Sequence, residues 1–367
     1  MKLVHSSAGT VLLAIATLTL GCSSSDKDSG GGDGDVSVDA DGGPGDADDT
    51  GTLADDTGEA PEPEDCDGLV SELDPEDAST GWFYRDSLTV TFEEVPEYEA
   101  VRFSLVDGDG ADVPFTVTWN EVHGLDAYLQ ADLIGSTIYT LTVGCENEMS
   151  ATFETDEFGA PLESDLTSLV GNVYELDLPN AEFTEPPAVG ALLGSYLSAP
   201  LLASVQEATD ESLTLLVAQG YWDDDGVPHQ DMGTSCYDFP PADFSEAPFF
   251  AADTPFINIQ YQSGAIEADI PMQDMHLEGT FSPDGSAMGG AWIGGLIDTS
   301  SLGPLLDLGD ADEPGVICEY ISVFGLSCED CGDGTEYCLY VEAHFDDAPL
   351  IEGMVIDPDP LGESAGG

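Results

Sequence analysis

Positive charge is almost missing from this chain. Its 367 residues include 75 Asp and Glu but only 4 Lys and Arg, which gives a formal net charge of −71. Such a surface cannot neutralise phosphates, so nucleic acids and anionic lipid headgroups are excluded as partners. At about 1 M salt the Debye length falls to roughly 3 Å and the self-repulsion is screened. The composition is therefore typical of a saline habitat or of abundant divalent cations.

Long apolar runs and common catalytic motifs are also scarce. Beyond the N-terminal segment no apolar stretch approaches the roughly 18 residues that span a bilayer. The chain has no H-E-x-x-H sequence and no P-loop. Among 75 acids, any two could be proposed as the paired carboxylates of a glycosidase. We therefore expect a non-catalytic protein, and a carboxylate-dependent hydrolase is the less favoured hypothesis.

The N-terminus has the features of a secretory signal. Residues 1–21 contain Lys2, an apolar core and a small residue, Gly21, before Cys22. The sequence Leu18-Thr-Leu-Gly-Cys22 resembles the lipobox of bacterial lipoproteins, with Thr19 where that family prefers Leu. The resemblance implies that Cys22 carries lipid and that the chain is an envelope protein outside the cytoplasm, in the outer membrane. The alternative is an ordinary secreted protein.

Residues 22–65 and 358–367 differ in composition from the rest. The first segment consists largely of Asp and Gly, and residues 23–65 contain no aromatic residue. It cannot bury enough apolar area to offset the entropy of ordering, so we expect a disordered, self-repelling tether. The C-terminal segment is expected to be a disordered tail.

Residues 66–159 show the alternation typical of β-strands. Leu88, Val90 and Phe92 share one face of a strand, and Tyr139, Leu141 and Val143 share a face of another. Several such short strands, separated by Gly- and Asp-rich turns, favour a β-sandwich.

This region resembles an SbsA-type bacterial Ig-like domain. The resemblance rests on LDPEDASTGWFYRDSLTVTFEE, LIGSTIYTLTVGC and ATFETDEFG, which place family-typical residues at Pro75, Leu133, Thr137, Tyr139, Phe153 and Thr155. Gly81-Trp-Phe replaces the usual Gly-Val-Pro. Family members act mainly as spacers and adhesion modules, so the resemblance implies a fold and no chemistry.

Residues 160–357 are expected to form a second β-rich domain. Strands are predicted over 169–178, 213–219, 256–261, 266–270, 275–281, 287–297, 318–326 and 337–345, and a short helix over 298–306. An antiparallel β-sandwich and a lipocalin-like β-barrel both fit this pattern. The region resembles uncharacterised C-terminal domains of large-genome Gram-negative lipoproteins. The whole chain is thus predicted to be all-β after its acidic linker.

Seven cysteines remain besides Cys22. The preferred pairing for the Ig-like domain is Cys66 with Cys145, which would close a loop of roughly 80 residues. A second group, Cys318, Cys328, Cys331 and Cys338, is predicted to form two disulfides around a terminal hairpin. A redox pair and a zinc site are less favoured readings of this group, and three connectivities remain open. Cys236 either joins this group or stays free.

One acidic loop is the best metal candidate. It contains Asp223, Asp225, His229 and Asp231, which offer hard oxygens and an imidazole for weak Ca²⁺ binding. A run of solvated acids is the favoured interpretation of the same residues. His276 and His344 are expected at ordinary surface or half-buried positions. The tryptophans, among them Trp292, could stack on sugars or pack in the core.

Together these patterns predict a lipid-anchored, non-catalytic cell-surface protein. Its Ig-like spacer would present a β-domain to an unknown protein or carbohydrate ligand. The alternative hypothesis is a β-barrel that binds a small molecule or a divalent cation, and an apolar cavity within residues 160–357 would favour it.

Overall fold

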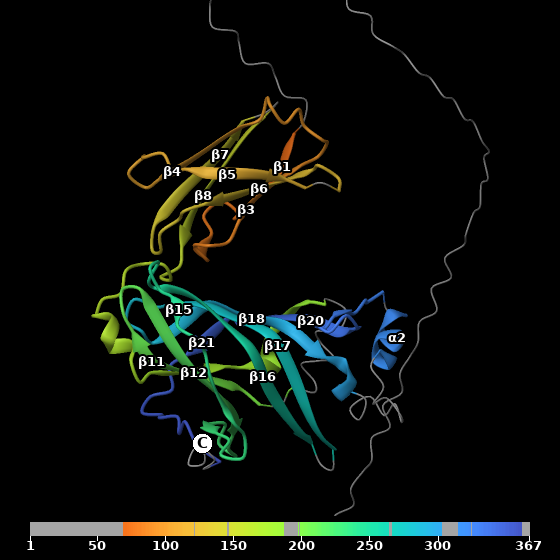
Figure 1. The fold of residues 1–367 in the computed structure, drawn as a ribbon. Helices are drawn as coiled ribbons and strands as arrows, with labels where there is room; N and C mark the ends of the chain where they lie inside the picture. Colours follow the sequence, from red (N-terminus) through yellow and green to blue (C-terminus); the bar gives the residue numbers. More distant parts are fainter. Residues whose placement is uncertain are drawn as a thin grey trace, which may run out of the picture. The chain divides into compact units, whose positions relative to one another are not determined.

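The chain folds almost entirely into β-structure. The computed structural model describes residues 69–120, 122–144, 147–186, 197, 199–263, 266–302, 315–323 and 325–361. These residues belong to one compact unit, Ala60–Gly367. They form three sheets, of four, thirteen and four strands (Figure 1). The predicted all-β class is therefore confirmed, whereas the predicted tether lies outside the described residues.

The two four-stranded sheets form the sandwich. One has the order β1 (Val70–Asp74), β3 (Leu88–Phe92), β6 (Asp126–Ala131), β5 (Phe115–Trp119). The other has the order β2 (Thr80–Trp82), β8 (Glu148–Thr155), β7 (Ile138–Gly144), β4 (Arg102–Asp107). The pairing of β2 with β8 is parallel and the other pairings are antiparallel. In Ig lettering the first sheet has the order A-B-E-D and the second contains C, F and G, as in a constant-type Ig domain. Strand β2 is an additional edge strand beside G, which is β8.

Strict alternation builds the core of the sandwich. Leu88, Val90 and Phe92 on β3 are all buried, as the period of two predicts. Tyr139 is the second residue of β7, the sixth strand of the Ig arrangement, and only 2% of its surface is exposed. Its hydroxyl accepts a hydrogen bond from the backbone N–H of Ile134 at 2.8 Å, at the corner before the strand. A tyrosine at this corner is a hallmark of Ig-like sandwiches.

The thirteen-stranded sheet contains all the strands after residue 170. Its main path runs β10-β20-β18-β17-β16-β15-β12-β11-β9. These strands are β9 (Val173–Leu176), β10 (Glu182–Glu185), β11 (Leu201–Ala208), β12 (Ser212–Trp222), β15 (Ala242–Asp243), β16 (Phe249–Ser263), β17 (Ile266–Phe281), β18 (Ala287–Asp298) and β20 (Glu336–His344). The short strands β13 (Pro228–Gln230) and β14 (Cys236–Asp238) pair with β12, β19 (Glu329–Asp330) pairs with β20, and β21 (Asp347–Pro349) pairs with β18.

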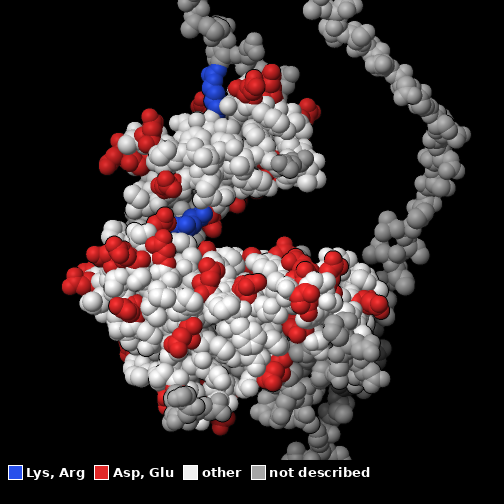
Figure 2. Space-filling model, in the orientation of Figure 1, with Lys and Arg blue, Asp and Glu red and all other residues white. Residues whose placement is uncertain are grey.

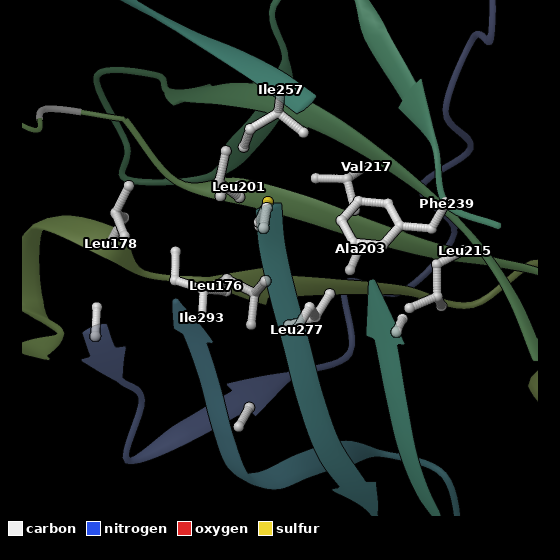
Figure 3. Close-up of a cluster of buried hydrophobic side chains, with 14 of the residues drawn as sticks. Leu176, Leu178, Leu201, Ala203, Leu215, Val217, Phe239, Ile257, Leu277 and Ile293 are labelled. Atoms are coloured by element: carbon white, nitrogen blue, oxygen red, sulfur yellow. The ribbon is translucent and has the colours of Figure 1, made fainter. Parts of the chain in front are cut away.

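The interior of this second domain is packed with side chains. Figure 3 shows residues from distant strands of one sheet converging, with Leu215 and Val217 on β12 and Leu277 on β17 among them. An isolated bridge joins Tyr174 on β9 to Leu350 after β21, but the described strands do not close into a barrel. The lipocalin-like alternative was therefore wrong. Buried aliphatic and aromatic residues occupy the space that a lipocalin leaves for its ligand.

Strand β12 is covered on both faces, which explains its nearly continuous apolar sequence. Leu215 and Val217 point into the main core, whereas Leu216 and Ala218 belong to a second cluster with Ile356. The C-terminal residues thus cover the outer face of this part of the sheet. A strand that is buried on both sides loses the polar alternation of a half-exposed one.

Several elements differ from the sequence prediction. The three strands predicted between 256 and 281 are two long strands, β16 and β17. Residues predicted as a strand from Cys318 form helix α2 (Val316–Ser322), which buries Ile317 and Ile321 four positions apart. The β-branched residues of this segment hid its helical period. The predicted helix over 298–306 begins as a single 3₁₀ turn, Thr299–Leu302. Two further 3₁₀ turns, Leu166–Leu169 and Leu178–Asn180, flank β9.

Candidate functional site

Acidic side chains cover the surface, and most of the described ion-pair contacts join a carboxylate to a histidine. Figure 2 shows red atoms spread over the visible face with few blue ones. Each of the four described histidines lies within ion-pair distance of a carboxylate. The pairs are His123 with Asp126, His229 with Asp223, His276 with both Asp253 and Glu278, and His344 with Glu342. When protonated, these histidines supply positive charge to carboxylates on a surface that has few lysines and arginines.

Two of these histidines flank a tryptophan on neighbouring strands. His276 on β17, Trp292 on β18 and His344 on β20 form what we call the histidine–tryptophan ladder. The ring centroids of His276 and Trp292 are 4.6 Å apart, and those of Trp292 and His344 are 5.9 Å apart. The strand register places Trp292 directly opposite both Glu278 and His344. Cross-strand pairing thus stacks the three rings along the sheet.

Carboxylates hold both ends of the ladder. His276 Nδ1 lies 2.8 Å from Asp253 Oδ1, and its Nε2 lies 3.2 Å from Glu278 Oε2. His344 Nε2 lies 2.7 Å from Glu342 Oε1. The hydrogen bond with Glu278 is the main cause that raises the pKa of His276, against a smaller opposing effect of burial. The cluster is therefore suited to hold an imidazolium.

The acids of the ladder are held in the ionised form. Burial acts to raise the pKa of Glu278, but hydrogen bonds with His276 and Trp292 together hold it below its ordinary value. Glu342 behaves in the same way, since bonds from His344 and Thr184 outweigh the effect of burial on its pKa. Ionised Glu278 thus stabilises positive charge on His276.

The ladder is not built as a sugar platform. The two imidazoles lie at 35° and 21° to the Trp292 ring, one on each neighbouring strand. Stacking a sugar requires a free aromatic face, and here both faces have a protein partner. The polar atoms of the cluster also satisfy one another. We interpret the ladder as a charged cross-strand cluster that stabilises the sheet.

A second group of contacts joins the sandwich to the sheet, and we call it the interdomain joint. Phe83, Tyr84 and Arg85 follow β2, and Phe158 follows β8. A side chain at Gly290 would collide with the Phe83 ring, and one at Gly289 with the Phe158 ring. Two glycines in β18 are therefore required so that two phenylalanines can lie against the sheet backbone.

Polar contacts complete the joint. Tyr84 Oη lies 3.1 Å from Thr280 Oγ1 on β17. The Arg85 guanidinium lies 3.6 Å from the centroid of the Phe249 ring, in cation–π geometry, and 3.4 Å from a carboxylate oxygen of Glu246. One of the few cations of the chain is thus placed at this contact.

The predicted metal-binding residues lie on and around β13, and the carboxylates of Asp223 and Asp231 are hydrogen-bonded within this segment. Asp223 Oδ1 accepts the backbone N–H groups of Asp225 and Val227, and its Oδ2 lies 3.0 Å from His229 Nε2. Asp231 Oδ1 instead accepts the N–H of Gly233 at 2.8 Å. Among the described residues no three His, Cys, Asp or Glu side chains are grouped to hold a metal ion. The Ca²⁺ hypothesis stays a prediction.

The terminal cysteines form two disulfides, as predicted, and the structure resolves their connectivity. Cys318 bonds to Cys328, which ties helix α2 to the segment before β19. Cys331 bonds to Cys338 within the terminal hairpin. Cys236 is a free, half-buried thiol whose pKa is raised by burial. The lipidation site Cys22 and the predicted pair Cys66 and Cys145 lie outside the described residues.

Sequence reasoning missed the ladder and the joint. His276 with Glu278, and Glu342 with His344, are i, i+2 pairs, which share one face of a strand. That spacing was visible in the sequence, but the register of β17, β18 and β20 was not.

The sequence near its C-terminus also contains Gly362-Glu-Ser364-Ala-Gly366, which has the G-x-S-x-G spacing of a nucleophile elbow. Such a serine acts at a strand-to-helix turn, and these residues lie outside the described part of the chain.

The fold defines an Ig-like β-sandwich attached to an open, packed β-sheet domain. No family model matches this chain, and comparison with curated proteins finds no match. Within the residues that the structure describes, no helix is long and apolar enough to cross a membrane.

Proposed function

We propose that this chain is a lipid-anchored, non-catalytic protein of the bacterial outer membrane, exposed outside the cytoplasm. Its Ig-like sandwich acts as a spacer, and the thirteen-stranded domain is the part presented to a protein or carbohydrate partner. The sequence around Cys22 supports the anchor, and the extreme acidity leaves lipid attachment as the means of holding the chain at a membrane.

The interdomain joint is the observation that carries this proposal. A spacer that merely separates domains needs only a flexible linker. Here Phe83 and Phe158 lie against glycines of β18, and Arg85 contacts both an aromatic ring and a carboxylate. Such contacts support a sandwich that positions the second domain as well as separating it. The packed core beneath the sheet favours use of an outer surface over an internal ligand.

Metabolic labelling with palmitate tests the anchor. The wild type is expected to be labelled and to fractionate with membranes, whereas Cys22→Ala is expected to lose both properties. Cys236→Ala is the matched control, because Cys236 is another cysteine outside a disulfide, and it should be labelled like the wild type. A soluble, unlabelled wild type would overturn the proposal.

Presentation at the surface is tested on intact cells. Brief treatment with an external protease is expected to release fragments of the second domain from wild-type cells. Cells that express Cys22→Ala should retain no surface-bound fragment. Full protection of the wild type until the cells are lysed would contradict an exposed domain.

A further inference from the structure

An acidic residue of the sandwich lies at the centre of the joint. Asp156 comes directly after β8, and its Oδ1 accepts the backbone N–H of Phe158 at 3.0 Å. Phe158 is the residue that lies against Gly289. The carboxyl of Asp156 therefore sets the local geometry of the segment that contacts the sheet.

Carboxylates on both sides of the joint act electrostatically on Asp156. Asp86, after β2, and Glu157 belong to the sandwich, and Asp347 belongs to β21 of the sheet domain. Asp347 pairs directly with Gly289 in the strand register. Contact between the domains thus brings like charges together in a partly desolvated place.

Positive compensation is weak at this position. Burial is the largest cause acting on Asp86 and raises its pKa. His344 acts to lower that pKa, and Asp74 acts to raise it. Arg85, the cation of the joint, is paired with Glu246. Burial, followed by the neighbouring acids, raises the pKa of Asp156 to about 7, although its bond from Phe158 acts to lower it.

We propose that the interdomain joint is controlled by protons: it closes while Asp156 is protonated and loosens when Asp156 is ionised. The apolar contacts of Phe83 and Phe158 favour closure, and the carboxylates of Asp156, Asp86, Glu157 and Asp347 oppose it once charged. The same balance makes the joint sensitive to salt, because about 1 M salt screens charges beyond roughly 3 Å. This inference concerns the joint alone and does not depend on the lipid anchor.

The direction of the pH effect follows from linkage. In the open state Asp156 is solvated and titrates near 4, whereas in the closed state its pKa is about 7. The closed state therefore binds the proton more tightly, and closure weakens as the pH rises from about 4 to about 7. Three pKa units correspond to up to about a thousandfold in the closing equilibrium, reduced by solvent screening of a half-buried group.

Distance measurements on the full chain test the proposal. Spin labels are carried on non-canonical side chains at position 138 of the sandwich and position 232 of the sheet domain, where Ile138 and Met232 are 49% and 50% exposed. At pH 5 the wild type is expected to give a narrow distance distribution. At pH 8.5 in low salt the distribution should broaden, and about 1 M NaCl should narrow it again.

Variants decide whether Asp156 is the group that titrates. Asp156→Asn keeps the acceptor for Phe158 but cannot ionise, so its distribution should stay narrow at pH 8.5. Asp347→Asn should act in the same direction with a smaller effect. Asp132→Asn is the control, since Asp132 is an exposed acid of the sandwich, and it should broaden like the wild type. Phe158→Ala should broaden the distribution at both pH values.

Either of two results would overturn the proposal. One is a wild-type distribution that does not change between pH 5 and pH 8.5 in low salt. The other is an Asp156→Asn variant that broadens as much as the wild type, which would assign the titration to another group.

Discussion

The sandwich and the thirteen-stranded sheet are both antiparallel in the main, yet they are specified in different ways. The longest sandwich strand has 8 residues, whereas β17 has 16. Sandwich strands alternate buried and exposed positions, and a familiar strand order follows. In the sheet domain, β12 is instead buried on both faces. A local pattern thus determines the first domain, and long-range pairing determines the second.

The largest expected effect separates the two cores. Phe281 is fully buried in the sheet domain, where its ring stacks on Phe250 at 5.2 Å. Phe153 is its counterpart in the sandwich, with 1% of its surface exposed. Each change to Ala should lower the stability of its own domain by about 3–5 kcal/mol through lost contacts and a cavity. Calorimetry combined with hydrogen exchange should show each variant destabilising one domain.

The two phenylalanines serve as controls for each other. Because their clusters share no residue, Phe281→Ala should leave exchange in β3 and β7 unchanged, and Phe153→Ala should leave exchange in β12 and β18 unchanged. If either variant shifted both domains equally, the chain would unfold as one cooperative unit and the comparison would fail.

A disulfide predicted for the sandwich would sharpen the comparison. If Cys66 pairs with Cys145, the closed loop of roughly 80 residues contributes about 4 kcal/mol in the chain-entropy model. Cys66→Ser should then lower the urea midpoint of the sandwich and leave that of the sheet domain unchanged. Cys236→Ser controls for the loss of a thiol. An unchanged midpoint for Cys66→Ser, or a free thiol detected at Cys66 in the wild type, would refute the pairing.

Prediction from sequence succeeded where the signal was local. The alternation of Leu88, Val90 and Phe92 identified β3, and the position of Tyr139 matched an Ig-like corner. The turn Ser282–Gly285 is equally local: Pro283 and Gly285 suit a type I turn, and the Gly285 N–H donates to the Ser282 carbonyl at 2.9 Å. In each case residues within a few positions of one another determine the structure, so a single sequence carries enough information.

Prediction failed where two distant segments had to be aligned. The ladder needs Glu278, Trp292 and His344 at one register across β17, β18 and β20, and no local pattern shows that register. Gly289 and Gly290 lie within the predicted strand 287–297, but the sequence does not show that aromatic rings of the other domain lie against them. The barrel hypothesis failed for the same reason, because a sheet closes into a barrel only if its two edge strands pair with each other. That pairing is not visible in the sequence of either edge strand.

The terminal disulfides should give an effect of intermediate size that is confined to the sheet domain. The bonds Cys318–Cys328 and Cys331–Cys338 close short loops, with separations of 10 and 7 residues. Short loops of this kind contribute about 2–3 kcal/mol each in the chain-entropy model. The double variant Cys331→Ser with Cys338→Ser should lower the melting temperature of the sheet domain. A matching decrease in the sandwich would show that the hairpin supports both domains.

The smallest expected effect is a pH dependence that distinguishes the ladder from the sandwich. The pKa of His276 is raised above 6.5 in the folded protein, chiefly by its bond with Glu278. The stabilisation is therefore complete below about pH 6.5 and is lost as the pH rises through the folded pKa. The side chain is 26% exposed, so the pair contributes about 1 kcal/mol or less. Urea titrations between pH 6 and pH 9 measure it.

A matched pair of variants isolates this contribution from other titrations. His276→Gln should remove it, so the difference in stability between wild type and variant should shrink as the pH rises. His123→Gln, in the sandwich, is the control, because His123 lies a longer 3.6 Å from Asp126 and its side chain is 46% exposed. Since Glu278 has a lowered pKa, it stays ionised throughout this range and cannot produce the change. Parallel curves for wild type and His276→Gln would show that the ladder holds no proton-linked stability, and the chain's histidines would then not replace its missing lysines and arginines.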